Sequence, residues 1–139
     1  MKNVLVVGSG AREVAVSRKI SESKVEHALF CASSEKNPQI ESLCSGYLVC
    51  PLSHIKNIRE YALLKKIDLV FIGPENPLAD GIVNELEAVG ISCVGPKKEV
   101  AMIETSKSFA RDIIENCAPE KNPARKSFKS LSGVESFIN

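Results

Sequence analysis

The amino-acid sequence predicts an α/β fold, namely an open, Rossmann-like, mostly parallel sheet with flanking helices. Short apolar runs rich in β-branched residues recur through residues 4–94, and strands that are apolar on both faces are typical of a parallel sheet covered on both sides. Between these runs the apolar residues change to helical spacing. Such alternation gives parallel strands joined by right-handed crossovers.

The first expected strand covers residues 4–7, V-L-V-V, and runs directly into a glycine turn. Three further runs resemble it, at residues 28–31, 68–72 and 91–94. Residues 47–50 form a weaker candidate. The sequence therefore predicts four strands and a less certain fifth.

Helices are expected between the strands. The first covers about residues 11–21, where Ala11, Val14 and Ala15 make a narrow apolar face. Two clearer stripes with helical spacing follow, one of Ile55, Ile58 and Ala62 and one of Ile82, Val83, Leu86 and Val89. Gly90 is expected to end the second of these helices.

The alternation stops after residue 94. Gly95-Pro96 predicts a turn, residues 97–103 a short helix, and Thr105 the cap of a stronger helix. The apolar face of that helix is expected to hold Phe109, Ala110, Ile113, Ile114 and Cys117. Residues 118–126 are polar and contain two prolines, so they predict a loop or linker.

The last residues suggest a chain cut within a larger protein. Ser132 and Glu135 have the spacing of a capping box, which begins a helix, and the chain ends at Asn139. Isolated helices shorter than ~12–15 residues are marginal. The alternative is a short terminal helix that packs on the sheet.

Composition narrows the class of protein. Of 139 residues, 44% are hydrophobic and 25% charged, which is typical of a soluble globular domain. The net charge of +1 argues against a nucleic-acid binder, and no apolar run approaches the ~20 residues of a membrane span. Five cysteines without a C-x-x-C pair indicate reduced thiols and a cytoplasmic protein. With two histidines, no zinc spacing is present and no metal ligand is predicted.

Residues 8–13, G-S-G-A-R-E, follow the first strand and open the first helix. Backbone N–H groups and the positive end of the helix dipole converge at such a turn, which favours an anion. Gly8 and Gly10 allow positive φ and close approach of a phosphate, and Arg12 can pair with it through two hydrogen bonds. We expect a phosphate-bearing ligand here. A nucleotide cofactor, or a tight turn with a surface arginine, is the alternative.

The second candidate loop is residues 73–81, G-P-E-N-P-L-A-D-G, after the run 68–72. It lies at the carboxyl end of a central strand, the edge at which open α/β sheets bind ligands. Pro74 and Pro77 are expected to stiffen the loop and to hold Glu75 between them. A rigid carboxylate there suits ribose hydroxyls or an amine. The alternative is a carboxylate that stabilises a helix N-terminus.

Four segments carry a resemblance: residues 8–13, 67–81, 95–96 and 104–109, in this order. Together they resemble the N-terminal part of the phosphoribosylamine–glycine ligase (glycinamide ribonucleotide synthetase) family, ATP-grasp enzymes of purine biosynthesis. The G-P-E-x-P-L-x-x-G loop and the S-K-x-F helix start are the specific parts, and the match covers residues 2–117.

The resemblance implies a pre-ATP-grasp N domain over residues 1–103 and the truncated beginning of an ATP-grasp domain over residues 104–139. The reaction would couple glycine to the amine of 5-phosphoribosylamine, with ATP becoming ADP and phosphate and with Mg²⁺ or Mn²⁺ as the metal. Lys107 matches a lysine expected near the ATP phosphates. The implied substrate-binding residues are Gly8, Gly10, Arg12, Glu13, Asn37, Gly73, Pro74, Glu75 and Pro77.

The chain also departs from the family pattern. Ala11 and Val14 stand where the motif G-G-R-E-H-A has glycine and histidine, so no imidazole is available at position 14. The family's P-G-N-A-G loop is expected near residues 33–38, where only Asn37 can take the place of its asparagine. The metal-binding carboxylates and most of the adenine pocket of the ATP-grasp body are missing. We therefore assign no catalytic residue and expect this chain alone to be inactive.

Two other functions remain open. One is an NAD(P)-binding Rossmann domain of an oxidoreductase. Its fingerprint has a third glycine where this chain has Glu13, and Glu35 is the only acid near the end of the second strand. The other is a non-catalytic phosphoribosyl-binding module. Cys31, at the end of the second strand, is expected to be an inert packing residue, with a reactive thiol as the alternative.

Overall fold

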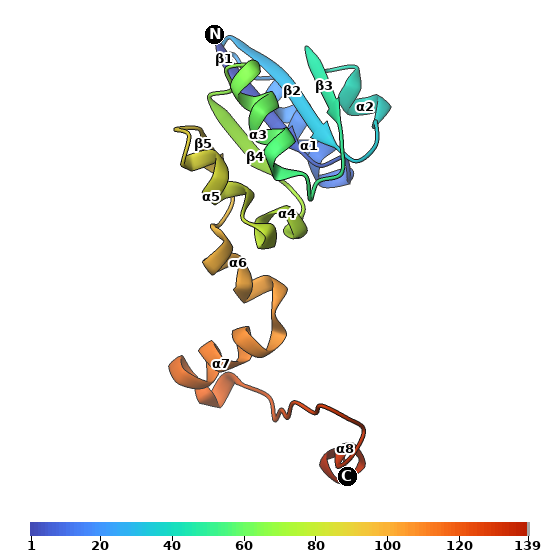
Figure 1. Cartoon of the computed structure of the whole chain (residues 1–139), viewed down its shortest axis with the longest axis vertical. Helices are drawn as coiled ribbons and strands as arrows, with labels where there is room; N and C mark the ends of the chain where they lie inside the picture. The colour runs from blue at the N-terminus through green and yellow to red at the C-terminus, as the bar shows by residue number, and fades with distance from the viewer. Residues whose placement is uncertain (139) are drawn as a thin grey trace. The chain divides into compact units, whose positions relative to one another are not determined.

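The apolar runs form a five-stranded sheet in the computed structural model, which describes residues 1–138 (Figure 1). Every neighbouring pair of strands is parallel. The strand order is β3-β2-β1-β4-β5, for β1 (Lys2–Val7), β2 (His27–Ser33), β3 (Gly46–Val49), β4 (Leu69–Ile72) and β5 (Ser92–Val94). The predicted fold class is confirmed, and the weaker strand candidate at residues 47–50 is confirmed with it.

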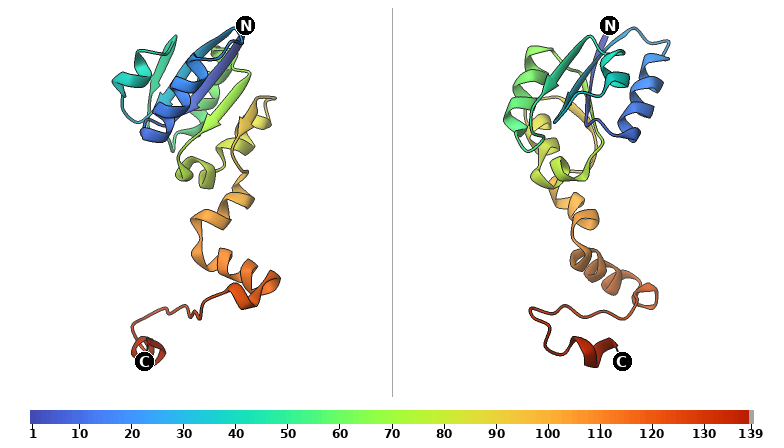
Figure 2. Two further views of the ribbon diagram at one scale, coloured as in Figure 1. Left: turned by 180° about the vertical axis from the view of Figure 1, so that it is seen from behind. Right: turned by 90° about the vertical axis from the view of Figure 1, so that its right-hand side faces the viewer.

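Helices cover both faces of this sheet. The chain divides into two units, Met1–Ala101 and a second that begins at Met102. In the first unit, α1 (Ala11–Ser21) and α3 (Ile55–Leu64) lie on opposite faces of the sheet (Figure 2). The other helices within it are α2 (Pro38–Glu41), α4 (Glu75–Asp80) and α5 (Ile82–Glu87).

The core forms where the apolar stripes of the helices meet the strands. Leu5, Val7 and Val70 in the central strands are completely buried. The predicted stripes on α3 and α5 supply Ile58, Ala62, Ile82, Val83 and Leu86 to the same cluster. Val89 does not join them, because α5 ends at Glu87 and the chain turns at Gly90, whose φ is +81°.

The apolar face predicted for α1 is wrong. Ala11 and Ala15 are exposed, whereas Glu13 and Ser17 are only 5% and 0% exposed. A spacing of four residues places these two on one side of the helix. The spacing of apolar residues did not predict that this side is buried, because it carries Glu13. The carboxylate of Glu13 accepts a hydrogen bond from the backbone N–H of Gly10 at the start of the helix.

The segment 73–81 is largely helical and is not the rigid loop that the sequence predicted. Pro74 is the N-cap residue of α4, which begins at Glu75 and ends at Asp80, and Gly81 is its C-cap. Pro77 fits within the first turn of this helix, where its missing N–H removes no intrahelical hydrogen bond. Gly81 has a φ of +92° and separates α4 from α5. Glu75 thus lies in the first turn of a helix, the position expected from the sequence as the alternative to a rigid loop.

The second unit contains helices and irregular chain. α6 (Lys98–Thr105) begins in the first unit and ends in the second, and α7 (Lys107–Cys117), η1 (Pro119–Lys121) and α8 (Val134–Ile138) follow. The hydroxyl of Ser106 accepts the Phe109 N–H at 3.3 Å, so Ser106 rather than Thr105 caps α7. The predicted cap was one residue off because α6 continues through Thr105. Within residues 1–138, no helix is long and apolar enough to cross a bilayer.

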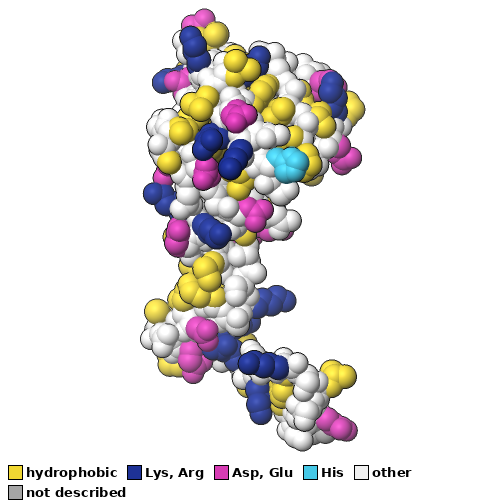
Figure 3. All heavy atoms as spheres, viewed as in Figure 1, with side chains coloured by type: hydrophobic (Ala, Val, Ile, Leu, Met, Phe, Trp, Pro, Cys, Tyr) yellow, Lys and Arg dark blue, Asp and Glu magenta, His cyan; other side chains and the backbone are white. Residues whose placement is uncertain are grey.

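Charges are mixed over the surface. On the face shown in Figure 3, basic and acidic side chains are interspersed without a field of one sign. This distribution agrees with the net charge of +1. This face therefore lacks the field of one sign that attracts a large polyanion.

Candidate functional site

The two candidate loops begin side by side. β1 pairs with β2 on one side and with β4 on the other, so the direction of the strand order reverses between β1 and β4. Val7 and Ile72 are register partners, and the Gly73 N–H donates to the Val7 carbonyl at 3.1 Å. Ligands of open α/β sheets bind at the carboxyl ends of strands at such a reversal. Residues 8–13, here called the glycine loop, and the segment that begins at Gly73, here called the Gly73 loop, therefore form one candidate site.

Glu13 lies at the centre of this site. Its Oε2 accepts the Gly10 N–H at 2.6 Å, which satisfies a donor at the start of α1. A Cβ atom at Gly73 would lie 1.9 Å from Glu13 Oε1, and one at Gly8 would lie 3.0 Å from its Cδ. The glycines of both loops thus leave the space that this carboxylate fills.

The two glycines of the first loop have different reasons to be glycine. Gly8 has a φ of +115°, as predicted. Gly10 does not, since its φ is −79°, which any residue adopts. A side chain at Gly10 is instead excluded by contact, because its Cβ would lie 2.9 Å from Glu13 Oε2.

Arg12 joins the two loops from the outside. Its Nη1 donates to the Gly73 carbonyl at 2.8 Å, although the residue as a whole is exposed. A guanidinium has five N–H donors in a planar fork, so donors remain for an anion beside the loops. Arg12 therefore connects the two loops and also places an accessible positive charge where the strand order reverses, between β1 and β4.

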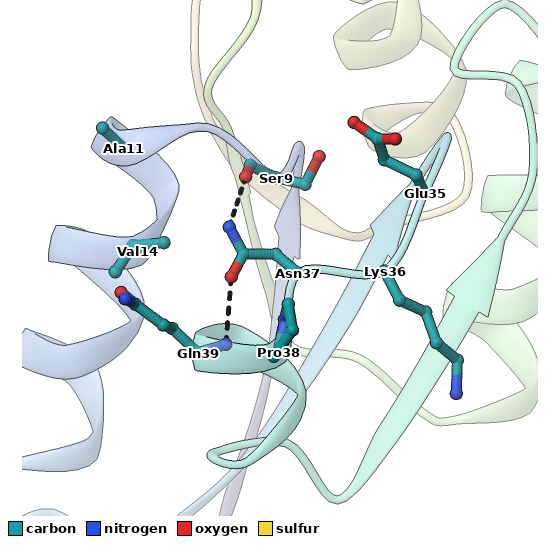
Figure 4. A pocket seen from close by; sticks show the side chains of 8 residues that line it. All are labelled: Ser9, Ala11, Val14, Glu35, Lys36, Asn37, Pro38 and Gln39. Carbon is teal, nitrogen blue, oxygen red and sulfur yellow. Dashed lines mark hydrogen bonds between the residues drawn. The ribbon is translucent and has the colours of Figure 1, made fainter.

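Asn37 connects a third loop to the glycine loop (Figure 4). Its Nδ2 donates to the Ser9 carbonyl at 2.8 Å, and its Oδ1 accepts the Gln39 N–H at 3.0 Å, capping α2. These contacts border a cleft of about 710 Å³ lined by Ser9, Ala11, Val14, Glu35, Lys36, Asn37, Pro38 and Gln39. Lys36 points away from Ser9 in Figure 4 and pairs with Glu41, so its charge is directed elsewhere.

A second cleft opens at the same edge of the sheet. It measures about 480 Å³ and is lined by Ser34, Pro51, Leu52, Ser53, Pro74, Asn76, Pro77, Ala79 and Asp80. Pro77 is less than 2% exposed and contributes packing beneath this surface. Glu75 is exposed in the first turn of α4. Successive residues of one loop, Ser34 and Glu35, line the two clefts.

Cys31 lies beneath the glycine loop as a buried thiol. Its Sγ is 3.5 Å from the Gly8 carbonyl, to which it donates. Burial raises the pKa of the Cys31 thiol to about 11. The thiolate is the reactive form of cysteine, so the structure favours the inert packing role over the reactive one.

The structure brings most of the predicted site residues to one edge. The two loops hold Gly8, Gly10, Arg12, Glu13, Gly73, Pro74 and Glu75, and Asn37 reaches them through Ser9. Lys107 is exposed in the first turn of α7. Across the part of the chain that the structure describes, no three His, Cys, Asp or Glu side chains gather as metal ligands.

Sequence reasoning missed Tyr47 and Ser33. The Tyr47 hydroxyl is 2.8 Å from Ser33 Oγ and accepts the Asn37 N–H at 3.2 Å. Burial raises the pKa of Tyr47, so its hydroxyl stays neutral and can also donate. The sequence around Tyr47, a weak strand candidate at residues 47–50, contains no local pattern that indicates these contacts. They depend on the register that places Tyr47 beside Cys31, two residues before Ser33.

Known proteins have sequences similar to that of this chain. A profile of the family described as "Phosphoribosylglycinamide synthetase, N domain" matches residues 2–104. The chain is 41% identical over 136 residues to a phosphoribosylamine–glycine ligase from Methanococcoides burtonii, and 40% identical over 139 residues to one from Thermococcus kodakarensis. Both alignments cover 98% of this chain, but the chain spans only 32% and 31% of the lengths of these relatives.

Solved structures share the fold. The structure of a phosphoribosylglycinamide synthetase from Anaerococcus prevotii aligns with 99% of this chain, with a TM-score of 0.68 at 11% identity. The aligned part covers 34% of that protein. The structure of an N5-carboxyaminoimidazole synthetase from Staphylococcus aureus, complexed with ADP, also aligns with 99% of this chain, with a TM-score of 0.73 at 10% identity. The aligned part covers 35% of that protein. At such identities the likeness concerns the fold alone. Because the profile match extends over residues 2–104, the chain belongs to the phosphoribosylglycinamide synthetase N-domain family.

Proposed function

We propose that this chain is the substrate-binding N-terminal part of a phosphoribosylamine–glycine ligase, and that it binds 5-phosphoribosylamine at the carboxyl edge of its sheet. The observation that carries the proposal is the meeting of the two family motifs at the reversal point between β1 and β4. The complete enzyme would use ATP to join glycine to the amine, giving glycinamide ribonucleotide, ADP and phosphate. Such an enzyme of purine biosynthesis acts in the cytoplasm.

Each group at this edge suits one part of the substrate. Arg12, whose guanidinium is accessible beside the two loops, supplies positive charge for the phosphate, and the N–H groups at the start of α1 other than that of Gly10 add to it. The exposed carboxylate of Glu75 suits ribose hydroxyls or the amine. Glu13 is already bonded to Gly10 and buried, so its contribution is to hold the glycine loop in shape.

The same carboxylate disfavours a dinucleotide. The dinucleotide fingerprint needs a third glycine for close packing of helix against strand and brings a pyrophosphate to the helix N-terminus. Here Glu13 stands at that position, and its negatively charged Oε2 accepts the Gly10 N–H at 2.6 Å. A pyrophosphate at this place would overlap with the Glu13 side chain and would be repelled by its negative charge.

ATP and its metal belong to the complete ligase. We place Lys107, in residues 104–139, near the ATP phosphates as part of the ATP-grasp domain. Among residues 1–138, no three ligating side chains cluster as they would in a metal site. We therefore derive no catalytic step within this chain.

Calorimetric titration of the chain with ribose 5-phosphate tests the proposal. We expect saturable binding of ribose 5-phosphate and no binding of NAD at the same concentrations. Glu75→Gln is expected to weaken binding about tenfold, or about 1.4 kcal/mol, because a charged hydrogen-bond acceptor becomes neutral. Glu60→Gln, an exposed substitution on α3, is the matched control and should leave the affinity unchanged. Binding of NAD but not of ribose 5-phosphate would reverse the proposal.

A further inference from the structure

Tyr47 makes a set of hydrogen bonds at the edge of the sheet that the proposed function has not used. It lies on β3, and its hydroxyl donates to the Glu35 carbonyl at 3.2 Å and accepts the Asn37 N–H at 3.2 Å. The same hydroxyl is 2.8 Å from Ser33 Oγ, which donates to the Glu35 carbonyl at 2.5 Å. One phenol thus holds the backbone on both sides of residue 36.

This network continues to the glycine loop. Asn37, whose N–H is bound by Tyr47, reaches Ser9 with its side chain at 2.8 Å. A continuous path of hydrogen bonds therefore runs from β3 through residue 37 to the loop between β1 and α1. Ser33 is completely buried at the base of this path, so the hydroxyl pair does not exchange its partners freely with water.

The segment that Tyr47 holds forms part of both clefts. Ser34 lines the smaller cleft, and Glu35 and Asn37 line the larger one. Residues 33–38 of this segment, S-S-E-K-N-P, contain no glycine. A glycine-poor loop between β2 and α2 still needs a fixed backbone if it is to present groups to a ligand.

We propose that Tyr47 is a positioning residue for the phosphoribosyl site, and that its hydroxyl fixes residues 35–37 so that Asn37 is held against the glycine loop. This inference rests on the proposed function for the identity of the ligand. The positioning itself is a property of the ligand-free protein. Tyr47 acts through Asn37 and does not touch the substrate.

The chain offers a matched control, because Tyr61 is its only other tyrosine. The Tyr61 hydroxyl is buried and has no hydrogen-bond partner in the structure of residues 1–138. Tyr61→Phe therefore removes the same atom without removing a described hydrogen bond. Tyr47→Phe removes the atom that holds the loop.

The test compares the affinity of the two variants for ribose 5-phosphate by calorimetry. Tyr47→Phe is expected to weaken binding about fivefold, or about 1 kcal/mol, the typical net contribution of one hydrogen bond. Tyr61→Phe should leave the affinity unchanged. In an Asn37→Ala background, Tyr47→Phe should cost almost nothing further, because residues that act through one another are not additive. Equal affinities of the two single variants, or additive losses in the double variant, would overturn the inference.

A second readout separates this inference from the proposed function. Hydrogen exchange of the Asn37 amide, followed by NMR without ligand, should be faster in Tyr47→Phe than in Tyr61→Phe or the unchanged protein. If the unchanged protein does not bind ribose 5-phosphate, the proposed function fails, and amide exchange alone decides the positioning role. Equal exchange in both variants would then show that Tyr47 does not hold the loop.

Discussion

At the scale of single residues, one carboxylate lies against three glycines. Gly8, Gly10 and Gly73 come from two loops, and a side chain on any of them would meet Glu13 within about 3 Å. Sequence reasoning treated the glycines as space for a phosphate. The structure shows that Glu13 takes up much of this space itself, and that Arg12 then ties the loops together.

Gly73→Ala is expected to destabilise the protein by about 1–3 kcal/mol, the usual cost of overpacking. The added Cβ would lie 1.9 Å from Glu13 Oε1, so the side chain must move and give up its bond to Gly10. In a Glu13→Ala background the same substitution should cost far less, because the clash is gone. Chemical denaturation of the four proteins measures both effects, and equal costs in the two backgrounds would contradict this explanation.

The cysteines differ in reactivity for a physical reason. Burial raises the pKa of Cys31 to about 11 from 9.0, whereas Cys117 is exposed on α7. A rise of two pKa units lowers the thiolate fraction near neutral pH about 100-fold. Alkylation followed by mass spectrometry at about pH 8 should therefore modify Cys117 well before Cys31. The rate at Cys31 should increase as the pH is raised toward 11, and fast modification of Cys31 at about pH 8 would contradict its burial.

At the scale of elements, the sequence predicted strands better than helix faces. The strands are uninterrupted apolar runs, and all five lie where they were expected. The face of α1 was misjudged because the residues that point inward, Glu13 and Ser17, are polar. The start of α4 was missed because two prolines suggested a loop, although proline is compatible with the first turn of a helix.

Ser17→Ala tests the burial assigned to α1. The Ser17 hydroxyl is completely buried, and it has no hydrogen-bond partner among the described residues. Removing an unsatisfied buried hydroxyl is expected to raise the free energy of unfolding by about 1 kcal/mol. Ala15→Ser, at an exposed position on the same helix, should change it by less than about 0.5 kcal/mol. A marked loss of stability in Ser17→Ala would show that the hydroxyl is bonded after all.

At the scale of the whole molecule, the topology accounts for the site. Residues 8–13 and 73–75 are far apart in the sequence, and adjacent parallel strands bring their loops together. This juxtaposition was predictable because both motifs follow buried strands. The role of Tyr47 was not, since it depends on strand register and on a hydroxyl that reaches residues 33–37.

The 139-residue chain alone is expected to release no ADP above background with glycine, phosphoribosylamine, ATP and Mg²⁺. Phosphoryl transfer from ATP needs carboxylates that hold the metal, and residues 1–138 contain no cluster of three ligating side chains. A coupled assay of ADP release measures this, with a phosphoribosylamine–glycine ligase of full length as the positive control. Release of ADP in step with glycine consumption by the short chain would contradict the assignment of the ATP site to the rest of the ligase.

Mapping of the ribose 5-phosphate site by NMR tests the central claim most directly. A ¹⁵N-labelled chain is titrated with ribose 5-phosphate, and the amides that shift are located on the sheet. We predict shifts at residues 8–12, at Asn37 and at residues 73–75, all at the carboxyl edge. Residues 23–26 and 66–68, which directly precede β2 and β4, serve as the internal control and should not shift. Shifts confined to that opposite edge, or the absence of any shift at the two motif loops, would contradict the account.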